Sequence, residues 1–415
     1  MSRVRIIGGG LSGVLAAFEA HRLGARDIEL HERFEQLGGS ALPTERHGVE
    51  LRERFIPFGP KDDPVRQRLE AHGVAFDEVE NRVGSVSPSD AGPPRYTPGF
   101  DGPALPCAQI AVDQPQGPSL AGRIIAFPAE LREPLARYVR WRLGPGSTEA
   151  HANAAASLGV ARILPLDADA ASFAAARRSN PRIDAFFAMA QNPWAHDDMD
   201  AAGEPAGGFG ALFRRCHRAL RQIGVRIQES SFVAPRQALV EHRPGDVLVW
   251  AANPAPLFRM FDRPVPRLLE TSHAAYVFAA RWTGPRPFRV NNFTADGVCF
   301  RVCLYESAGR TLLTAECAKE ADPTDLRYEV HRLVSGFEGD LALGELLCSS
   351  VKPRWTYQTV EAVAALAQLR GEFGQRFGAG AVSNGWEHGA PTERFRHLAG
   401  ELGAVLAANV RASAA

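Results

Sequence analysis

The feature that most constrains this chain is a glycine cluster close to its N-terminus, Gly8-Gly9-Gly10-Leu11-Ser12-Gly13. A short apolar run at residues 4–7 precedes the cluster, and apolar residues with helical spacing follow it. A second apolar run, at residues 28–31, ends at Glu32. This succession predicts a β-turn-α-β unit of about 30 residues, with the glycines in the turn between the first strand and the helix.

The glycines at positions 8, 10 and 13 have the spacing G-x-G-x-x-G, which is typical of dinucleotide sites. Gly8 allows the tight turn, Gly10 lets a pyrophosphate approach the backbone, and Gly13 lets the helix pack closely on the strand. The free N–H groups and the dipole at the start of the helix attract the pyrophosphate. Glu32, nineteen residues after Gly13, can accept hydrogen bonds from both ribose hydroxyls and would repel a 2′-phosphate, which argues against NADP.

A second glycine pair, Gly38-Gly39, favours FAD over NAD as the ligand of this site. The pair follows shortly after the acidic residue, where the longer flavin dinucleotide needs a second close approach to the backbone. We therefore predict FAD as the cofactor. No metal is expected, because His196-Asp197-Asp198 stands in a polar stretch after a proline and is interpreted as solvated.

Elements of the nucleotide-binding type recur in the middle and at the end of the chain. An amphipathic helix follows a glycine-rich loop near residue 208, a long helix is predicted from 392 to 408, and strands are predicted at residues 225–228, 232–233, 238–241, 247–251 and 376–382. Two unlike insertions separate these parts, one helical (128–192) and one mainly strand-like (255–355).

This order predicts an α/β fold in which a Rossmann-like FAD-binding domain is assembled from three chain segments and carries an inserted α+β substrate domain. The FAD-binding domain would comprise residues 1–80, 205–255 and 356–415. The substrate domain would comprise residues 81–204 and 256–355.

The composition excludes several classes of partner. Lys plus Arg and Asp plus Glu are equal at 47 each, without a basic cluster, so no nucleic-acid partner is expected. Six cysteines are spread along the 415 residues and are interpreted as ordinary thiols.

No apolar run approaches the ~20 residues that a membrane span needs, so no integral membrane association is expected. Met1 leads almost directly into a predicted strand, which leaves no room for a signal peptide. We expect a cytoplasmic enzyme acting on a small molecule, with homodimerisation left open.

Residues 5–40 carry the flavin signature of a superfamily that this chain resembles, which contains the amine oxidases, protoporphyrinogen oxidase, phytoene desaturases and UDP-galactopyranose mutase. The resemblance implies the Rossmann-like fold and an FAD site. The cofactor contacts that it implies are Gly8, Gly10, Leu11, Ser12, Gly13, Glu32, Arg33, Gly39 and Ser40.

Later parts of the chain resemble the remaining flavin segments of this superfamily. Val233, in the second nucleotide segment, would contact the adenine side of the cofactor. The stretch Asp-Val-Leu-Val-Trp-Ala-Ala, from residue 246, resembles the strand that returns to the cofactor. The last segment would contribute Gly380, and Thr392 would lie near the flavin pyrimidine, where a helix N-terminus stabilises negative charge.

Three residues are candidates for the substrate side of the site. Arg301 stands in an apolar strand-like run, and its surroundings resemble the mutase stretch in which an arginine reaches the substrate diphosphate. Such an arginine can pair with a carboxylate or phosphate, although an outward-facing arginine fits the alternation equally well. His388 and Trp386 precede the last helix, where a histidine can act as acid or base and a tryptophan can shape the site. A loop histidine that only caps local structure is the alternative for His388.

The leading hypothesis is an FAD-dependent oxidoreductase, amine oxidase-like, that oxidises a C–N or C–C bond of a small polar metabolite by hydride transfer to flavin. Molecular oxygen or another acceptor would reoxidise it. The alternative is a mutase-like isomerase without net redox change. Residues 54–59 lack the histidine of the mutase's loop beside the flavin, which speaks against that chemistry. A third hypothesis is a flavin-fold protein that serves as a binding or structural subunit.

Overall fold

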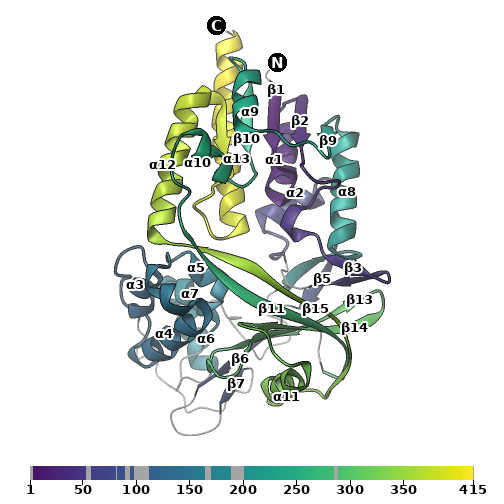
Figure 1. Ribbon diagram of the computed structural model, residues 1–415, viewed down its shortest axis with the longest axis vertical. Helices are drawn as coiled ribbons and strands as arrows, with labels where there is room; N and C mark the ends of the chain where they lie inside the picture. The colour runs from purple at the N-terminus through teal and green to yellow at the C-terminus, as the bar shows by residue number, and fades with distance from the viewer. Residues whose placement is uncertain are drawn as a thin grey trace.

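The computed structural model describes residues 3–52, 58–80, 82–88, 94–97, 112–163, 170–187, 201–284 and 288–414. A sheet flanked by long helices forms one end of the molecule, and a larger sheet with a block of short helices forms the other (Figure 1). Both chain termini lie at the end that carries the first sheet.

The first sheet is parallel, with five strands in the order β16-β10-β1-β2-β9. Its strands come from three separate parts of the chain: β1 (Arg3–Ile7) and β2 (Asp27–His31), β9 (Arg226–Gln228) and β10 (Val247–Trp250), and β16 (Ala381–Ser383). A parallel order of this kind needs crossover connections, which the intervening helices supply. The predicted three-segment α/β fold is confirmed.

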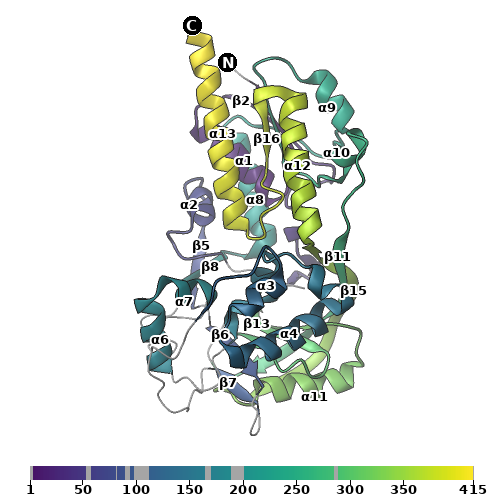
Figure 2. The same cartoon turned by 90° about the vertical axis from the view of Figure 1, so that its left-hand side faces the viewer.

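Helices cover both faces of this sheet, because its strands are apolar on both sides. On one face, Val4, Ile6 and Val249 pack with helices α1 (Leu11–Arg22), α8 (Gly208–Gln222) and α13 (Pro391–Ala414). On the other, Ile7 and Leu248 pack with α9 (Pro235–Glu241), α10 (Ala255–Met260) and α12 (Val360–Phe377). Figure 2 shows α12 and α13 running away from the lower half of the molecule.

Three predicted strands are wrong, and one of them, at residues 232–233, is an irregular stretch before α9. The residues at 238–241 lie in helix α9, which begins at Pro235 and has a side-chain hydrogen bond from Gln237 to Glu241, four residues apart. A proline in the first helical turn is favourable, and it outweighs the strand preference of the valine that follows. The strand predicted at 376–382 begins only at Ala381, because α12 continues to Phe377.

The second sheet has seven strands in the order β15-β11-β14-β13-β12-β6-β7. Two of them, β11 (Leu268–Trp282) and β15 (Leu341–Gln358), form a long antiparallel pair. The others are β6 (Arg82–Ser87), β7 (Arg95–Thr97), β12 (Phe288–Asn292), β13 (Cys299–Ser307) and β14 (Arg310–Cys317). One face is apolar and packs on helix α11 (Pro323–Val334).

The remaining elements are shorter or form a separate helical block. The helical block comprises α3 (Leu120–Ile125), α4 (Ala129–Leu143), α5 (Ala154–Leu158), α6 (Ala170–Ser179) and α7 (Pro181–Phe186), and it has a core of its own. Two small antiparallel sheets pair β3 (Thr44–Arg46) with β4 (Val49–Leu51) and β5 (Phe76–Glu80) with β8 (Ala201–Pro205), and helix α2 (Pro64–Glu70) lies between β4 and β5 in the chain. Among the described helices, none is long and apolar enough to cross a membrane.

Candidate functional site

Three chain segments meet at the carboxyl edge of the parallel sheet, which is where open α/β sheets bind their ligands. The Ala251 N–H donates to the carbonyl oxygen of Ile7 over 2.9 Å, and the Asn384 side-chain amide donates to the Ala251 carbonyl over 3.2 Å. A β-carbon at Gly8 would lie 2.8 Å from the Ala252 nitrogen. The ends of β1, β10 and β16 are thereby held around the glycine cluster.

The glycine cluster has the geometry that its spacing predicts. Gly8 has a φ of +105°, a conformation that residues with side chains rarely adopt. Gly13 lies against the Gly8 carbonyl so closely that no side chain would fit. A β-carbon at Gly10, by contrast, would meet no protein atom within 4 Å, so the space beside this residue is free for a ligand.

Helix α1 begins at this cluster without a side-chain cap. The first N–H groups of a helix have no partner within the helix, and a cap, water or ligand must satisfy them. Leu11 and Ser12, which carry such groups, are half-buried at the edge of the sheet. An uncapped helix start beside Gly10 fits the pyrophosphate of a dinucleotide.

Glu32 lies at the end of β2 with its side chain almost fully buried. One carboxylate oxygen accepts from the Gly9 N–H over 2.7 Å and the other from the Phe34 N–H over 2.9 Å. Each oxygen has a further lone pair that can accept from a ribose hydroxyl. Its neighbour Arg33 is exposed, with its guanidinium stacked over the Phe34 ring at 4.4 Å.

The second glycine pair lies directly beside the first. The Gly38 N–H donates to the Gly9 carbonyl over 2.9 Å, and Gly38 and Gly10 form a parallel β-bridge. A β-carbon at Gly39 would lie 3.4 Å from the Gly10 α-carbon. Ser40, which follows, is exposed. The structure therefore brings together the two glycine motifs that the sequence separates by 25 or more residues.

Three residues predicted to contact the cofactor lie in different places. Val233 is buried against the sheet, two residues after Ser231, whose N–H donates to the Glu32 carbonyl over 2.8 Å. Thr392, in the first turn of α13, donates to the Asp63 carboxylate over 2.9 Å. Gly380 precedes β16 and packs against the Asp246 carbonyl at the amino edge of the sheet, opposite the glycine cluster. That position removes Gly380 from the residues that converge on the site.

His388 and Trp386 follow β16 but point to different surroundings. The Trp386 indole is buried in the core beside Phe373 of α12, with 5.9 Å between ring centroids. The His388 ring is half-buried and lies 5.2 Å from the His397 ring of α13. Between them, Glu387 pairs with Arg370 over 2.7 Å. Trp386 is thus a packing residue of the sheet's helical layer, and His388 alone of the two stays near the loop surface.

Arg301 faces the side of the seven-stranded sheet that α11 does not cover. Its guanidinium makes three hydrogen bonds of 2.7 to 2.9 Å with Glu316, its neighbour on β14. Burial by itself would lower the pKa of Arg301, but the Glu316 carboxylate raises it overall. The sequence predicts that Arg301 pairs with a carboxylate or phosphate group of a ligand. In the structure, Glu316 of the protein itself supplies a carboxylate to Arg301.

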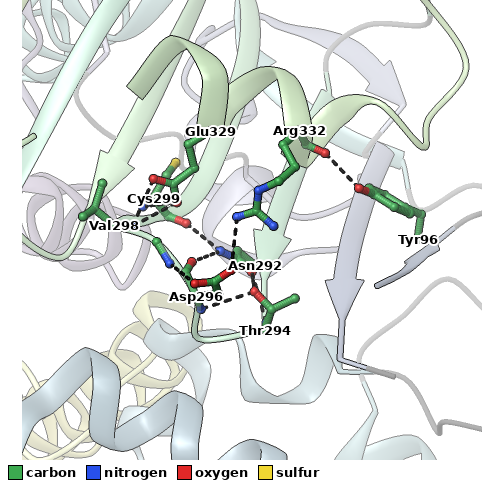
Figure 3. Close-up of polar contacts among 9 residues, drawn as sticks. Tyr96, Asn292, Thr294, Asp296, Val298, Cys299, Glu329 and Arg332 are labelled. Atoms are coloured by element: carbon green, nitrogen blue, oxygen red, sulfur yellow. Dashed lines mark hydrogen bonds and ion pairs between the residues drawn. The ribbon is translucent and has the colours of Figure 1, made fainter. Parts of the chain in front are cut away.

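The stretch before Arg301 is ordered by side chains that the sequence analysis did not assign. Asn292, fully buried, accepts from the Thr294 N–H over 3.0 Å and donates to the Cys299 carbonyl over 2.9 Å, as Figure 3 shows. The Glu329 carboxylate of α11 accepts from the N–H groups of Val298 and Cys299, at 2.8 to 3.0 Å. This segment fixes the turn that leads into β13 and so positions Arg301.

No family model matches the chain, and no curated protein matches it by sequence. Solved structures match over nearly the whole length. Reduced UDP-galactopyranose mutase has a TM-score of 0.62 at 14% identity, over 99% of this chain and 98% of the mutase. A protein of an Exiguobacterium species, named as a candidate protoporphyrinogen oxidase, has a TM-score of 0.56 at 14% identity, over 98% of this chain and 99% of that protein's chain. An engineered putrescine oxidase has a TM-score of 0.54 at 15% identity, over 98% of this chain and 99% of the oxidase.

The chain therefore has the fold of the amine oxidase, protoporphyrinogen oxidase and UDP-galactopyranose mutase flavoproteins, which confirms the resemblance found in residues 5–40. At 14–15% identity, what this likeness establishes is the fold. The reaction has to be argued from the site of this chain itself.

Proposed function

We propose that this protein is an FAD-dependent oxidoreductase that oxidises a C–N or C–C bond of a small polar metabolite by hydride transfer to the flavin. The observation that carries the proposal is the carboxyl edge of the parallel sheet, where the uncapped start of α1, the buried Glu32 and the Gly38 pair converge. An oxidase and a mutase share this fold, and open α/β sheets bind their ligands at this edge.

The residues at this edge fit FAD. The N–H groups of Leu11 and Ser12 would bind the pyrophosphate, because no side chain caps them. Glu32 would accept from the ribose, and the backbone beside Val233 would border the adenine. Gly39 and Ser40 would border the part of the cofactor that leads to the flavin, since Gly39 adjoins Gly10.

FAD, when bound, supplies a hydride acceptor that no side chain of the protein can replace. The chain has to orient the substrate carbon and exclude water. We place the substrate between the segments 1–80, 205–255 and 356–415, which would bind the cofactor, and the segments 81–204 and 256–355. His388, half-buried near the carboxyl edge, is the residue that we propose to exchange a proton with the substrate.

The test begins with the purified protein, whose absorbance spectrum should contain the bands of bound flavin. Anaerobic addition of a substrate should bleach these bands, and admission of oxygen or an artificial acceptor should restore them. A protein that is colourless and does not take up added FAD would contradict the proposal at its first step.

The same experiment distinguishes the proposed oxidoreductase from a mutase-like isomerase. Turnover that starts only after chemical reduction of the flavin, with no net consumption of reductant, would replace the oxidoreductase by a mutase-like reaction. Retention of flavin without bleaching by any member of a broad metabolite panel, in either redox state, would instead favour the binding subunit.

A further inference from the structure

The face of the seven-stranded sheet that α11 leaves uncovered carries charged and polar side chains in register. Arg301 pairs with Glu316 on β14 and lies opposite Asn291 on β12. Arg289 lies two residues before Asn291, so its side chain emerges on the same face of the sheet. The opposite face, with Val290, is part of the apolar core.

Arg289 has no counter-ion of its own in the described part of the chain. Its Nε atom is buried and has no hydrogen-bond partner there. Burial and the positive charges of Arg162 and Arg301 together lower the pKa of Arg289 to about 9. Arg289 as a whole is half-buried, and a guanidinium with a buried, unpaired N–H is stabilised when an anion accepts from it.

Arg142, on helix α4, reaches the same region from the helical block. Its guanidinium lies 3.3 Å from the centre of the Phe300 ring and donates to the hydroxyls of Tyr138 and Tyr357, at 3.1 and 3.4 Å. The side chain is 7% exposed, and these partners are all neutral. Arg301 lies on the same ring, with 5.9 Å between its guanidinium carbon and the ring centre.

Arg142, Arg289 and Arg301 thus come from two parts of the structure, and of these three it is Arg301 that pairs with the Glu316 carboxylate. The ion pair of Arg301 and Glu316 is closed by three hydrogen bonds. Arg142 and Arg289, for which no carboxylate partner is found among the described residues, carry further positive charge, and Arg162 adds to it beside Arg289. Guanidinium groups of this kind bind carboxylate and phosphate groups through paired hydrogen bonds.

We propose that Arg142 and Arg289 bind an oxyanion, a carboxylate or phosphate group carried by the substrate, so that the metabolite oxidised is anionic and not a cationic amine. The identification of the bound anion with the substrate rests on the proposed function. The anion site itself does not depend on that function. A diamine such as putrescine would be repelled by the same charges.

The test measures binding of inorganic phosphate, succinate and putrescine to the purified holoprotein, by calorimetry and by the shift in melting temperature at constant ionic strength. Phosphate or succinate should bind to the wild type, and Arg142→Met and Arg289→Met should each weaken that binding by about tenfold or more. Arg281→Met, which removes an exposed arginine of the same sheet, should bind like the wild type. Whichever of phosphate and succinate binds more tightly identifies the group that the substrate carries.

A second readout separates ligand binding from a structural role. Without anion, Arg289→Met should unfold at the same or a higher denaturant concentration than the wild type, because an unpaired buried charge has been removed. Arg289→Lys, which keeps the charge but loses the planar fork, should give intermediate anion affinity. Equal anion binding by wild type and both methionine variants, or tighter binding of putrescine, would overturn the proposal. Loss of flavin from the wild type would refute the proposed function while these binding results still decide the anion site.

Discussion

The backbone of Gly13 lies directly on the carbonyl group of Gly8. A β-carbon at position 13 would overlap the Gly8 carbonyl oxygen and lie 3.0 Å from its carbonyl carbon. The first turn of α1 is therefore packed against the end of β1 as closely as two backbones allow. This contact sets the direction in which the start of α1 points toward the site.

Gly13→Ala should destabilise the protein, because the overlapping atom is rigid backbone that cannot move aside. We expect a loss of about 1 to 3 kcal/mol, the usual cost of overpacking, together with loss of flavin. Gly400→Ala is the matched control, since this helical glycine of α13 has no atom within 4 Å of a new β-carbon. It should gain up to about 1 kcal/mol from helix propensity. Urea unfolding of both variants measures the difference, and equal stabilities would contradict the packing argument.

Gly10→Ala should separate cofactor binding from stability. The new β-carbon meets no protein atom within 4 Å, so the protein without cofactor should melt within a degree or two of the wild type. The methyl group would occupy the space that we assign to the pyrophosphate, so FAD affinity should fall by at least about tenfold. Titration of the apoprotein with FAD checks this. Unchanged affinity would place the pyrophosphate elsewhere.

Glu32→Gln should weaken FAD binding, and its amide nitrogen can no longer accept from the Phe34 N–H. The amide keeps an acceptor for the Gly9 N–H but loses the charge, and charge-assisted hydrogen bonds contribute about 1.5 to 3 kcal/mol. We expect about a ten- to hundredfold higher dissociation constant for FAD. Glu35→Gln, at a nearby exposed position, is the control and should not change it. A wild-type affinity in Glu32→Gln would remove the ribose contact from the proposal.

Glu316→Gln should be strongly destabilising, by about 3 to 5 kcal/mol, because it leaves Arg301 charged in a buried position. The double variant Arg301→Met with Glu316→Leu should lose less than this single variant, since it removes both charges together. Chemical denaturation of the two proteins provides the comparison. If the double variant is less stable than Glu316→Gln, the ion pair stabilises the fold in its own right.

His72 should make the fold less stable in mild acid. Burial lowers its pKa below 6.5, and the charges of Arg68 and His21 lower it further, while its ring stacks on Phe18 at 4.0 Å. The folded protein therefore favours the neutral ring. Its contribution is complete above pH 6.5 and is lost as the pH falls from 6.5 toward the lowered value. His72→Phe should reduce the fall in unfolding free energy between pH 7.5 and 5. His331→Gln, at an exposed position, should leave this fall unchanged. Identical curves of unfolding free energy against pH for the wild type and both variants would contradict the assignment to His72.

The half that contains the parallel sheet was predictable because its signals are local. The turn at Gly8, the acid at Glu32 and the glycines at 38 and 39 each require a particular backbone conformation or charge within one β-turn-α-β unit. The errors lie where tertiary packing overrides local preference. The valine at 240 favours a strand, but the helix begun by Pro235 leaves its side chain on the surface.

The substrate side could not be predicted in the same way. Trp386 follows a strand of the sheet, as a site residue would, but its ring turns into the core beside Phe373. Arg301 looked free in its strand because Glu316, its partner, belongs to a different strand and is fifteen residues away. Arg142 carried no signal, since the residues that surround it come from α4, β13 and β15.

The sequence by itself determined the glycine cluster, the acid that follows it and the three-segment order of the parallel sheet, because short-range spacing dictates backbone conformation. Only the tertiary structure decided which charges are neutralised. Strand register puts Glu316 against Arg301, and it leaves the Nε of Arg289 without a hydrogen-bond partner among the described residues, while the partners of Arg142 are neutral. Electrostatic pairing depends on distances through space, and residues far apart in the chain set those distances.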